Sequence, residues 1–333
     1  MYVFSFFFSC GGTWGVRRLA LRYSLLDIPN QRSSHSHPTP HGGGLALLLS
    51  FYLGTGYLVF SGTIDIPHVL GLSGCGLGIA MVGLGDDLFH LSAAKRFLVH
   101  FFCAFLAVTF FISSFTAFLP GGNGMPLIFV RLLLVVGIVW LLNLFNFMDG
   151  IDGLAGAEAL SVALGAGVLL FCCGETGSYF SLLMILAASV LGFLIWNWPP
   201  AKIFMGDACS GFLGFCFGIL CLLTISSTGL TLWTWLLLLA AFVVDSTVTL
   251  MVRVWRGEKF YQAHRSHAYQ ILARRMGAHL KVTLCYVAIN WLFLFPLACF
   301  SVYRPESGLY LVIFSYSLLT ILCMVVGAGT TND

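Results

Sequence analysis

Apolar stretches of about 20 residues recur along almost the whole chain, separated by short polar gaps. They lie near residues 1–20, 43–61, 66–85, 97–118, 127–146, 153–173, 178–196, 210–226, 229–250, 282–301 and 308–327. A helix needs about 20 consecutive apolar residues to cross the hydrocarbon core of a bilayer. The pattern therefore predicts an all-α, polytopic integral membrane protein with about 10–11 transmembrane helices.

Composition excludes several classes of protein. Of the 333 residues, 59% are hydrophobic and only 9% are Asp, Glu, Lys or Arg, against about 25% charged residues in an ordinary soluble protein. So few charges cannot cover the surface of a soluble fold of this length, which excludes a soluble globular enzyme, a disordered protein and a nucleic-acid-binding protein. We expect a single transmembrane domain over residues 1–333.

The charged residues also indicate how the chain lies in the membrane. Of the 16 Lys and Arg residues, 14 fall in or beside alternate gaps, and only Arg131 and Arg304 fall on the other side. Because cytoplasmic loops carry the excess of Lys and Arg in membrane proteins, we predict cytoplasmic loops near 21–42, 86–96, 147–152, 197–209 and 251–281. Most of the acidic residues share these loops, so we expect a site that opens to the cytoplasm.

The first carboxylate motif is Gly85-Asp86-Asp87, followed by Lys95 and Arg96. Two adjacent carboxylates repel each other and lose hydration beside a membrane, and a cation or a proton-transfer role offsets that cost. A solvated helix end is the alternative.

The second motif runs from Asn146 to Gly153. Asn146, Asp149 and Asp152 are spaced by three and share one broad helix face, and the glycines let the backbone approach a ligand closely. An EF-hand calcium loop would need about 12 residues and a closing Glu, whereas this stretch runs directly into Leu154.

Two further segments lie in the predicted cytoplasmic loops. Pro199 and Pro200 prevent a continuous helix between 197 and 207, where Phe204 either packs in the core or stacks on a base. His264-Arg265-Ser266-His267 places paired basic groups that suit phosphate oxygens, or it is simply a polar loop. The segment 32–44 adds three His residues in no recognised zinc spacing, for which phosphate contact is the better interpretation.

Together these motifs place five carboxylates, several basic groups and glycine-rich turns on one face of the membrane. Oxygen ligands in that number suit Mg²⁺ with a diphosphate, and Mg²⁺ beside basic groups is typical of phosphoryl transfer. The membrane setting indicates that one substrate is a lipid phosphate. Glu158 and Asp245 lie inside predicted helices, where an acid is either functional or paired for structure.

The motifs resemble those of a known family. Gly85-Asp86-Asp87, the segment 146–153 and Phe204-Met205-Gly206-Asp207 resemble, over about residues 15–275 and in the same order, the polyprenyl-phosphate N-acetylhexosaminyl-1-phosphate transferases. The resemblance implies ten or eleven helices, Mg²⁺ or Mn²⁺, a UDP-sugar and undecaprenyl phosphate. The products would be a lipid-diphosphate-sugar and UMP, made on the cytoplasmic face of a bacterial inner membrane. It leaves a homodimer open and calls for no nucleic acid.

The resemblance also implies a role for each motif residue in the site. The catalytic residues would be Asp86, Asp87, Asp149 and His267, and Asp207 would be the metal ligand. The nucleotide would be bound by Asn146, Gly150, Ile151, Asp152, Asn197, Phe204 and His35, of which Gly150, Ile151, Asp152 and Phe204 would form a uracil pocket. His264 and Arg265 would contact phosphate.

The last motif reads His267-Ala268-Tyr269-Gln270 rather than a run of His. It resembles the subgroup that initiates O-antigen and lipopolysaccharide synthesis, with N-acetylglucosamine or a 6-deoxy N-acetylhexosamine as the sugar. A peptidoglycan phospho-MurNAc-pentapeptide transferase is the alternative within the family.

Two alternatives belong to other classes. A secondary transporter would carry acids near the midplane in broken helices and would show internal pseudo-symmetry, whereas these acids lie on one face and no repeat is evident. A metal-dependent membrane hydrolase could also use Mg²⁺ and Asp, but it would not need a uracil pocket. Release of UMP that depends on lipid phosphate separates the transferase from both.

Overall fold

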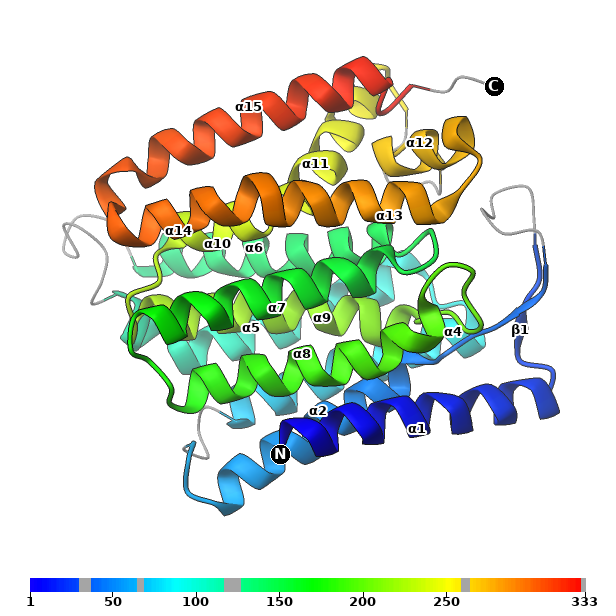
Figure 1. Ribbon diagram of the computed structural model, residues 1–333, viewed down its shortest axis with the longest axis horizontal. Helices are drawn as coiled ribbons and strands as arrows, with labels where there is room; N and C mark the ends of the chain where they lie inside the picture. The colour runs from blue at the N-terminus through cyan, green and yellow to red at the C-terminus, as the bar shows by residue number, and fades with distance from the viewer. Residues whose placement is uncertain (30–36, 65–68, 117–126, 259–263, 331–333) are drawn as a thin grey trace.

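The computed structural model describes residues 1–29, 37–64, 69–116, 127–258 and 264–330, without the side chains of 112–116. Most of these residues lie in helices that run side by side as one bundle (Figure 1). The predicted all-α, polytopic fold is confirmed.

The helices follow the predicted apolar stretches closely. Before the middle of the chain they are α1 (Tyr2–Arg22), α2 (Gly44–Phe60), a π-helical turn η1 (Leu70–Gly74) that continues into α4 (Cys75–Phe89), α5 (Ala93–Thr116), α6 (Leu127–Met148) and α7 (Leu154–Cys172). After it come α8 (Ser178–Asn197), α9 (Asp207–Ile225), α10 (Leu232–Leu238), α11 (Ala240–Trp255), α12 (Ala268–Met276), α13 (His279–Ala288), η2 (Ile289–Leu294), α14 (Phe295–Tyr303), η3 (Pro305–Ser307) and α15 (Gly308–Val326). Two short antiparallel strands, β1 (Leu26–Asp27) and β2 (Thr39–Pro40), lie between α1 and α2.

Among the described residues, eight helical segments are long and apolar enough to cross a membrane. The pair α10 and α11 makes a ninth if it is counted as one span, and it bends by 73°. The sequence predicted one continuous span over 229–250, because residues 232–255 contain neither Gly nor Pro to mark the break. The predicted total was higher because it included α1, which ends in three arginines, and α2, which has only 17 residues.

Helix α9 forms the axis of the bundle and is almost entirely buried. It packs against α2, α4, α5 and α6, and small residues at these crossings let the backbones approach closely. A Cβ at Gly83 of α4 would lie 2.5 Å from the backbone nitrogen of Ala208 and the carbonyl oxygen of Asp207. A Cβ at Gly214 would collide with the carbonyl oxygen of Leu141 on α6. The glycine at 83 therefore places the start of α9 directly against α4.

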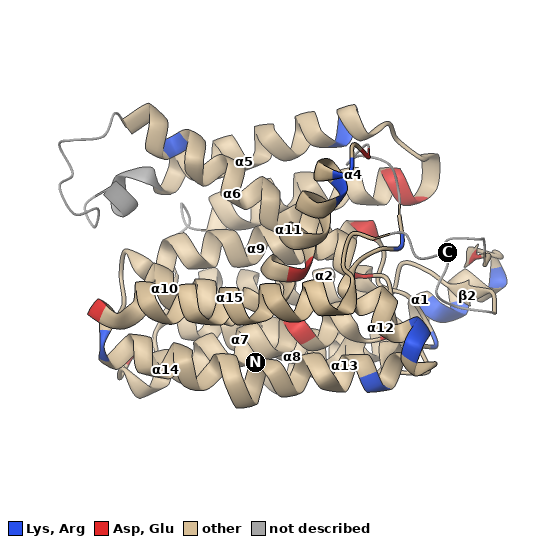
Figure 2. Ribbon diagram, turned by 90° about the horizontal axis from the view of Figure 1, so that it is seen from above, with Lys and Arg blue, Asp and Glu red and all other residues tan. Residues whose placement is uncertain are grey.

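Charged residues gather at one end of the bundle (Figure 2). This is the end where α4, α6 and α8 finish and where α9 and α12 begin. At the opposite end, Arg304 and Glu306 pair with each other in the turn before α15, 3.6 Å apart. The sequence motifs, which were predicted to gather on one face, therefore lie at one end of the bundle.

We predict that Gly83→Ala destabilises the protein by about 1–3 kcal/mol, because its Cβ must displace backbone rather than a flexible side chain. Thermal unfolding in detergent measures the effect. Gly137→Ala on α6 is the matched control, since its Cβ would have no neighbour within 4 Å, and the better helix propensity of Ala should leave stability unchanged or slightly raised. Equal unfolding temperatures for the two variants would contradict the close approach of α4 and α9.

Candidate active site

The site begins where the last turn of α4 meets the first turn of α9. The backbone N–H of Asp207, the first residue of α9, donates to Oδ1 of Asp87, 3.1 Å away. A carboxylate suits this position because the N-terminus of a helix has unpaired N–H groups and a partial positive charge. Gly206 has a φ of +94°, and a Cβ there would lie 2.9 Å from Oδ2 of Asp87. The glycine before Asp207 is therefore required by both backbone conformation and space.

One cation joins the carboxylates of the two helices. Arg96, near the start of α5, donates through Nη1 to Oδ2 of Asp86, and the same Nη1 lies 3.4 Å from Oδ2 of Asp207. His41, just before α2, contributes a second basic group, with Nε2 3.8 Å from Oδ1 of Asp87. The predicted meeting of Asp86, Asp87 and Asp207 is thus present, with Arg96 between two of them.

The end of α6 and the segment after it bring the second motif to the same place. Asn146 donates through Nδ2 to Oγ of Ser210, 3.2 Å away on α9. Loss of hydration raises the pKa of Asp149 well above its ordinary value, and repulsion from the nearby carboxylates, first Asp207 and then Asp87, raises it further. Such mutual repulsion indicates a surplus of negative charge in the site.

The carboxylates suit one mode of metal binding. Among the residues that the structure describes, no three His, Cys, Asp or Glu side chains are arranged to hold a metal by themselves. In phosphoryl-transfer sites, however, Mg²⁺ is usually held by one or two carboxylates together with water and substrate phosphates. Asp207 and Asp86, which converge on one Arg96 nitrogen, offer oxygen ligands of that kind.

Two predicted nucleotide contacts take part in bonds within the protein. Asn197, which is 3% exposed, accepts from the backbone of Gly153 at 3.1 Å and donates to the carbonyl of Ile203 at 2.9 Å. Asp152 accepts from the backbone of Ala201 at 3.0 Å, and its other oxygen lies 3.1 Å from Nδ1 of His279. These bonds fix the loop between α8 and α9 onto the starts of α7 and α13, so Asn197 acts here as a structural residue.

The other residues proposed for the uracil pocket also have contacts within the protein. Ile151 is buried in the core, and Gly150 packs so closely on the Tyr269 hydroxyl that a Cβ would collide with it. Phe204 is held by its backbone, which donates to Pro40 at 2.8 Å and accepts from Gly43 at 2.9 Å. His35 lies outside the described residues. Asp152 lines the second of the two cavities described below, whereas Phe204 lines neither of them.

The acid inside α11 anchors the last motif. The carboxylate of Asp245, which is 1% exposed, accepts from the backbone N–H groups of Ala268 at 2.8 Å and Tyr269 at 3.0 Å. It also accepts from the Tyr286 hydroxyl at 2.6 Å. Asp245 thus caps the N-terminus of α12 and fixes His267, whose Nδ1 lies 3.5 Å away. The sequence left Asp245 either a functional role or a structural one, and these contacts give it a structural role.

The second intramembrane acid, Glu158, likewise has a structural partner. Its Oε2 accepts from Nδ2 of Asn290 at 2.6 Å, which links α7 to the π-helical turn η2.

His264 and His267 stack on each other, with ring centroids 4.8 Å apart. Nδ1 of His264 lies 3.0 Å from Oγ of Ser266. Burial lowers the pKa of His264 to about 3, and the positive charge of the neighbouring basic groups lowers it further. His264 is therefore neutral at physiological pH and acts as a hydrogen-bonding group. The backbone carbonyl of Arg265 accepts from Arg274 at 2.8 Å.

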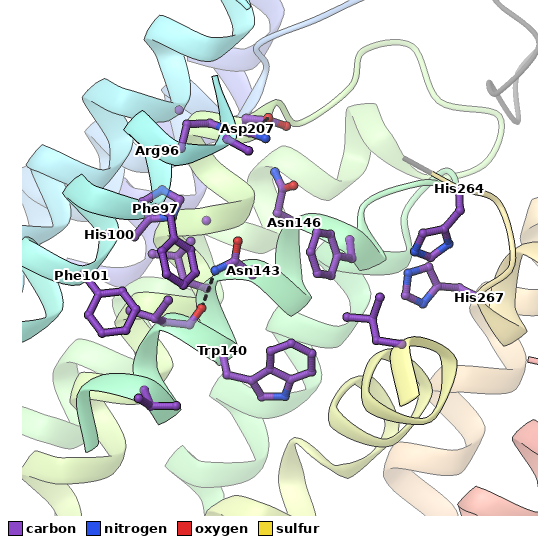
Figure 3. A pocket seen from close by; sticks show the side chains of 18 of the residues that line it. Arg96, Phe97, His100, Phe101, Trp140, Asn143, Asn146, Asp207, His264 and His267 are labelled. Carbon is purple, nitrogen blue, oxygen red and sulfur yellow. Dashed lines mark hydrogen bonds and ion pairs between the residues drawn. The ribbon is translucent and has the colours of Figure 1, made fainter. Parts of the chain in front are cut away.

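Two cavities open from this region. The first, of about 520 Å³, has a polar end formed by Arg96, Asn146, Asp207, His264 and His267. Its remaining walls are mainly apolar and come from α5, α6 and α11, as Figure 3 shows; they include Phe97, Phe101, Val139, Trp140, Leu142 and Leu250.

The second cavity, of about 540 Å³, is more polar and is lined by residues that include Asp152, Pro199, Pro200, Arg265, Arg274 and His279. Gln270 lines both cavities, so they adjoin at the start of α12.

Sequence reasoning missed several cavity residues. His100, Trp140 and Asn143 are single polar or aromatic residues inside apolar stretches, and His279 belongs to no motif. Only His100 carried a signal, because it follows Arg96 by four residues and so shares its helix face.

Comparison with known proteins places these motifs in a family. The sequence model described as glycosyl transferase family 4 matches residues 69–225, which contain Asp86, Asp87, the segment 146–153 and Asp207. This match supports the family recognised from the sequence motifs. The resemblance seen in the sequence is confirmed at that level.

Proteins that are similar to this chain carry related names. It is 27% identical over 331 residues to a probable undecaprenyl-phosphate N-acetylglucosaminyl 1-phosphate transferase of Bacillus subtilis, covering 96% of this chain and 88% of the relative. It is 33% identical over 224 residues to the decaprenyl-phosphate N-acetylglucosaminephosphotransferase of Mycolicibacterium smegmatis, covering 60% of this chain and 53% of the relative. A phospho-N-acetylmuramoyl-pentapeptide-transferase of Staphylococcus carnosus is 26% identical over 215 residues, which are 59% of this chain and 65% of the relative. The chain thus spans most of the first relative and about half of the second.

We predict that Asp245→Asn lowers stability by at least about 2 kcal/mol, because an amide cannot accept from all the donors that now converge on the carboxylate. Activity should fall with it, since His267 loses its fixed position. Thermal unfolding and initial rates measure both effects. Glu306→Gln, at an exposed acid far from the site, is the control. Normal unfolding of Asp245→Asn would show that α12 is held by other contacts.

The lowered pKa of His264 predicts a pH-dependent stability. His has a pKa of about 6.5 in the unfolded chain, whereas His264 in the folded protein has a pKa of about 3. On acidification, His264 is therefore protonated in the unfolded chain first, and in the folded protein only near pH 3. Stability is therefore lost as pH falls below about 6.5. Between pH 7 and pH 5, the melting temperature of the wild type should fall more than that of His264→Gln. Parallel decreases in the two proteins would contradict a neutral buried His264.

Proposed function

We propose that this chain transfers an N-acetylhexosamine 1-phosphate from a UDP-sugar to a polyprenyl phosphate and releases UMP. One observation carries the proposal: Asp207 and Arg96, which is paired with Asp86, stand at the polar end of a cavity whose other walls are mainly apolar. A ligand that fills both parts has an anionic head on a hydrocarbon tail. The printed names of the relatives, which act on undecaprenyl or decaprenyl phosphate, support this choice.

The chemistry needs little more than positioning. A phosphate oxygen of the lipid attacks the β-phosphorus of the UDP-sugar, and the bond from that phosphorus to the oxygen bridging it to the α-phosphate breaks, so that UMP leaves with the electron pair. The second pKa of a phosphomonoester is about 6, so the attacking group is already largely dianionic at pH 7. Asp86 therefore positions the nucleophile through its pairing with Arg96 rather than serving as an obligatory base.

The donor belongs in the second cavity. It is polar, and Arg265, Arg274 and His279 supply groups suited to the oxygens of a diphosphate and a sugar. Because Gln270 lines both cavities, a donor bound there would reach the polar end of the first with its diphosphate, where Asp207 and His267 lie. Mg²⁺ held by Asp207 with Asp86 would neutralise charge on the diphosphate and the leaving group.

The orientation and setting follow from the charge distribution. Because 14 of the 16 Lys and Arg residues lie in or beside alternate gaps, we propose that the site lies on the cytoplasmic face of a bacterial inner membrane. The ending His267-Ala268-Tyr269-Gln270 favours a first step of O-antigen, lipopolysaccharide or related polysaccharide synthesis. The peptidoglycan alternative is less favoured, since relatives named for N-acetylglucosamine match more of the chain or at higher identity.

UMP release tests the proposal. Purified protein would be mixed with Mg²⁺, undecaprenyl phosphate and one of several donors: UDP-N-acetylglucosamine, a UDP-6-deoxy-N-acetylhexosamine, UDP-MurNAc-pentapeptide or a GDP-sugar. We expect UMP only with a UDP-N-acetylhexosamine and only when lipid phosphate is present. Turnover with the pentapeptide donor alone would assign the chain to peptidoglycan synthesis. Nucleotide release without lipid phosphate would indicate a hydrolase.

We predict that Asp207→Asn lowers kcat at least about a thousandfold at saturating Mg²⁺. The change keeps the shape of the side chain but removes the charge, and a lost metal-held transition state costs several kcal/mol. Glu175→Gln, an exposed acid beyond the far end of α7, is the matched control and should be fully active. Near-normal turnover of Asp207→Asn would remove Asp207 from the metal site.

A further inference from the structure

His100 lies in the first cavity without a hydrogen-bond partner. It follows Arg96 by one helical turn on α5 and is 8% exposed. Among the described residues no partner is recorded for its ring, and its Nδ1 is fully enclosed. Figure 3 shows His100 between Arg96 and the aromatic side chains of Phe97 and Phe101.

An imidazole in this position has a preferred tautomer. Neutral His carries one N–H and one lone pair, and buried donors without an acceptor are rare in native proteins. Because nothing near Nδ1 accepts a hydrogen bond, the proton belongs on Nε2, the nitrogen left to face the cavity. His100 therefore offers a neutral donor to whatever fills this part of the cavity.

The neighbours of His100 limit what that ligand is. Two nearby side chains already donate within the protein: Nε1–H of Trp140 donates to Oγ1 of Thr247 at 3.3 Å, and one N–H of Asn143 donates to the carbonyl of Val139 at 2.7 Å. The other walls are hydrocarbon and aromatic rings, which exclude a fully hydrated ion. The hydrogen-bond acceptor for Nε2–H of His100 is therefore an oxygen that is covalently joined to an apolar chain.

We propose that Nε2–H of His100 donates to the phosphate of the polyprenyl acceptor on the side of its prenyl chain. This inference rests on the proposed function and adds a residue that selects the acceptor. Arg96, one turn nearer the polar end, provides charge for the same phosphate. A neutral hydrogen-bond donor on the prenyl side fixes how far the lipid phosphate enters the cavity. It does so without neutralising the charge on the phosphate oxygen that attacks.

Binding without turnover tests the proposal. Undecaprenyl phosphate and undecaprenol would be titrated separately into detergent-solubilised protein, with no nucleotide present, and complexes counted by native mass spectrometry. His100→Leu should lower the affinity for undecaprenyl phosphate about tenfold or more, which is the usual loss for a hydrogen bond to a charged group. Its affinity for undecaprenol should not change. His100→Gln, which keeps a donor at similar reach, should retain most of the affinity.

Two further variants separate binding from folding. His100→Asn keeps a polar amide but is too short to reach the phosphate, so it should bind undecaprenyl phosphate as weakly as His100→Leu. Thr109→Val, also on α5, removes a hydroxyl that donates only to the Phe105 carbonyl, 2.7 Å away, and it should behave as wild type. In steady state, KM for the acceptor should rise in His100→Leu while KM for the UDP-sugar stays constant.

Several results would overturn the proposal. Unchanged affinity of His100→Leu or His100→Asn for undecaprenyl phosphate would do so, and an equal loss for undecaprenol would show that His100 only shapes the cavity. A rise in KM for the UDP-sugar instead would move His100 to the donor site. His100-dependent binding of undecaprenyl phosphate in a protein that releases no UMP would contradict the proposed reaction but uphold this contact.

Discussion

The site depends on the contact between the end of α4 and the beginning of α9. A carboxylate of Asp87 accepts the first N–H of α9, and this contact is short enough only because residues 83 and 206 are glycines. It brings three carboxylates together at the point where the partial positive charge of a helix N-terminus offsets part of their repulsion. Without that backbone approach, Asp86 and Asp207 would belong to two separate helix ends, and Arg96 could not bridge them.

A second carboxylate places the other half of the site from within the bundle. Asp245 has no contact with the cavity, yet its bonds to the start of α12 fix His267, and with it the segment that separates the two cavities. The loss of hydration on burying this carboxylate is offset by hydrogen bonds from donors that are fixed in place. An acid inside a membrane helix is often taken as a reacting group, whereas this one and Glu158 stabilise the arrangement of helices.

The sequence predicted the helices and the meeting of Asp86, Asp87 and Asp207. The length of each apolar stretch and the distribution of Lys and Arg between the loops can be read directly from the sequence, and the motifs lie at helix ends. It could not predict the bend between α10 and α11, which no Gly or Pro marks. Nor could it tell that the amide of Asn197 bonds to its own loop, since a motif names a polar group and not its partner. His100 escaped notice because a single polar residue in an apolar helix looks like any other core residue.

The position of α9 at the axis has a consequence for how such an enzyme can diverge. The carboxylate proposed to hold the metal begins a helix enclosed on all sides, where almost any substitution disturbs several neighbours at once. Arg265, Arg274 and His279, by contrast, lie on peripheral segments around the second cavity. Substitutions there can reshape the second cavity, where we propose that the sugar donor binds, while the interior stays as it is. Donor preference and reaction chemistry are therefore free to evolve at different rates within one fold.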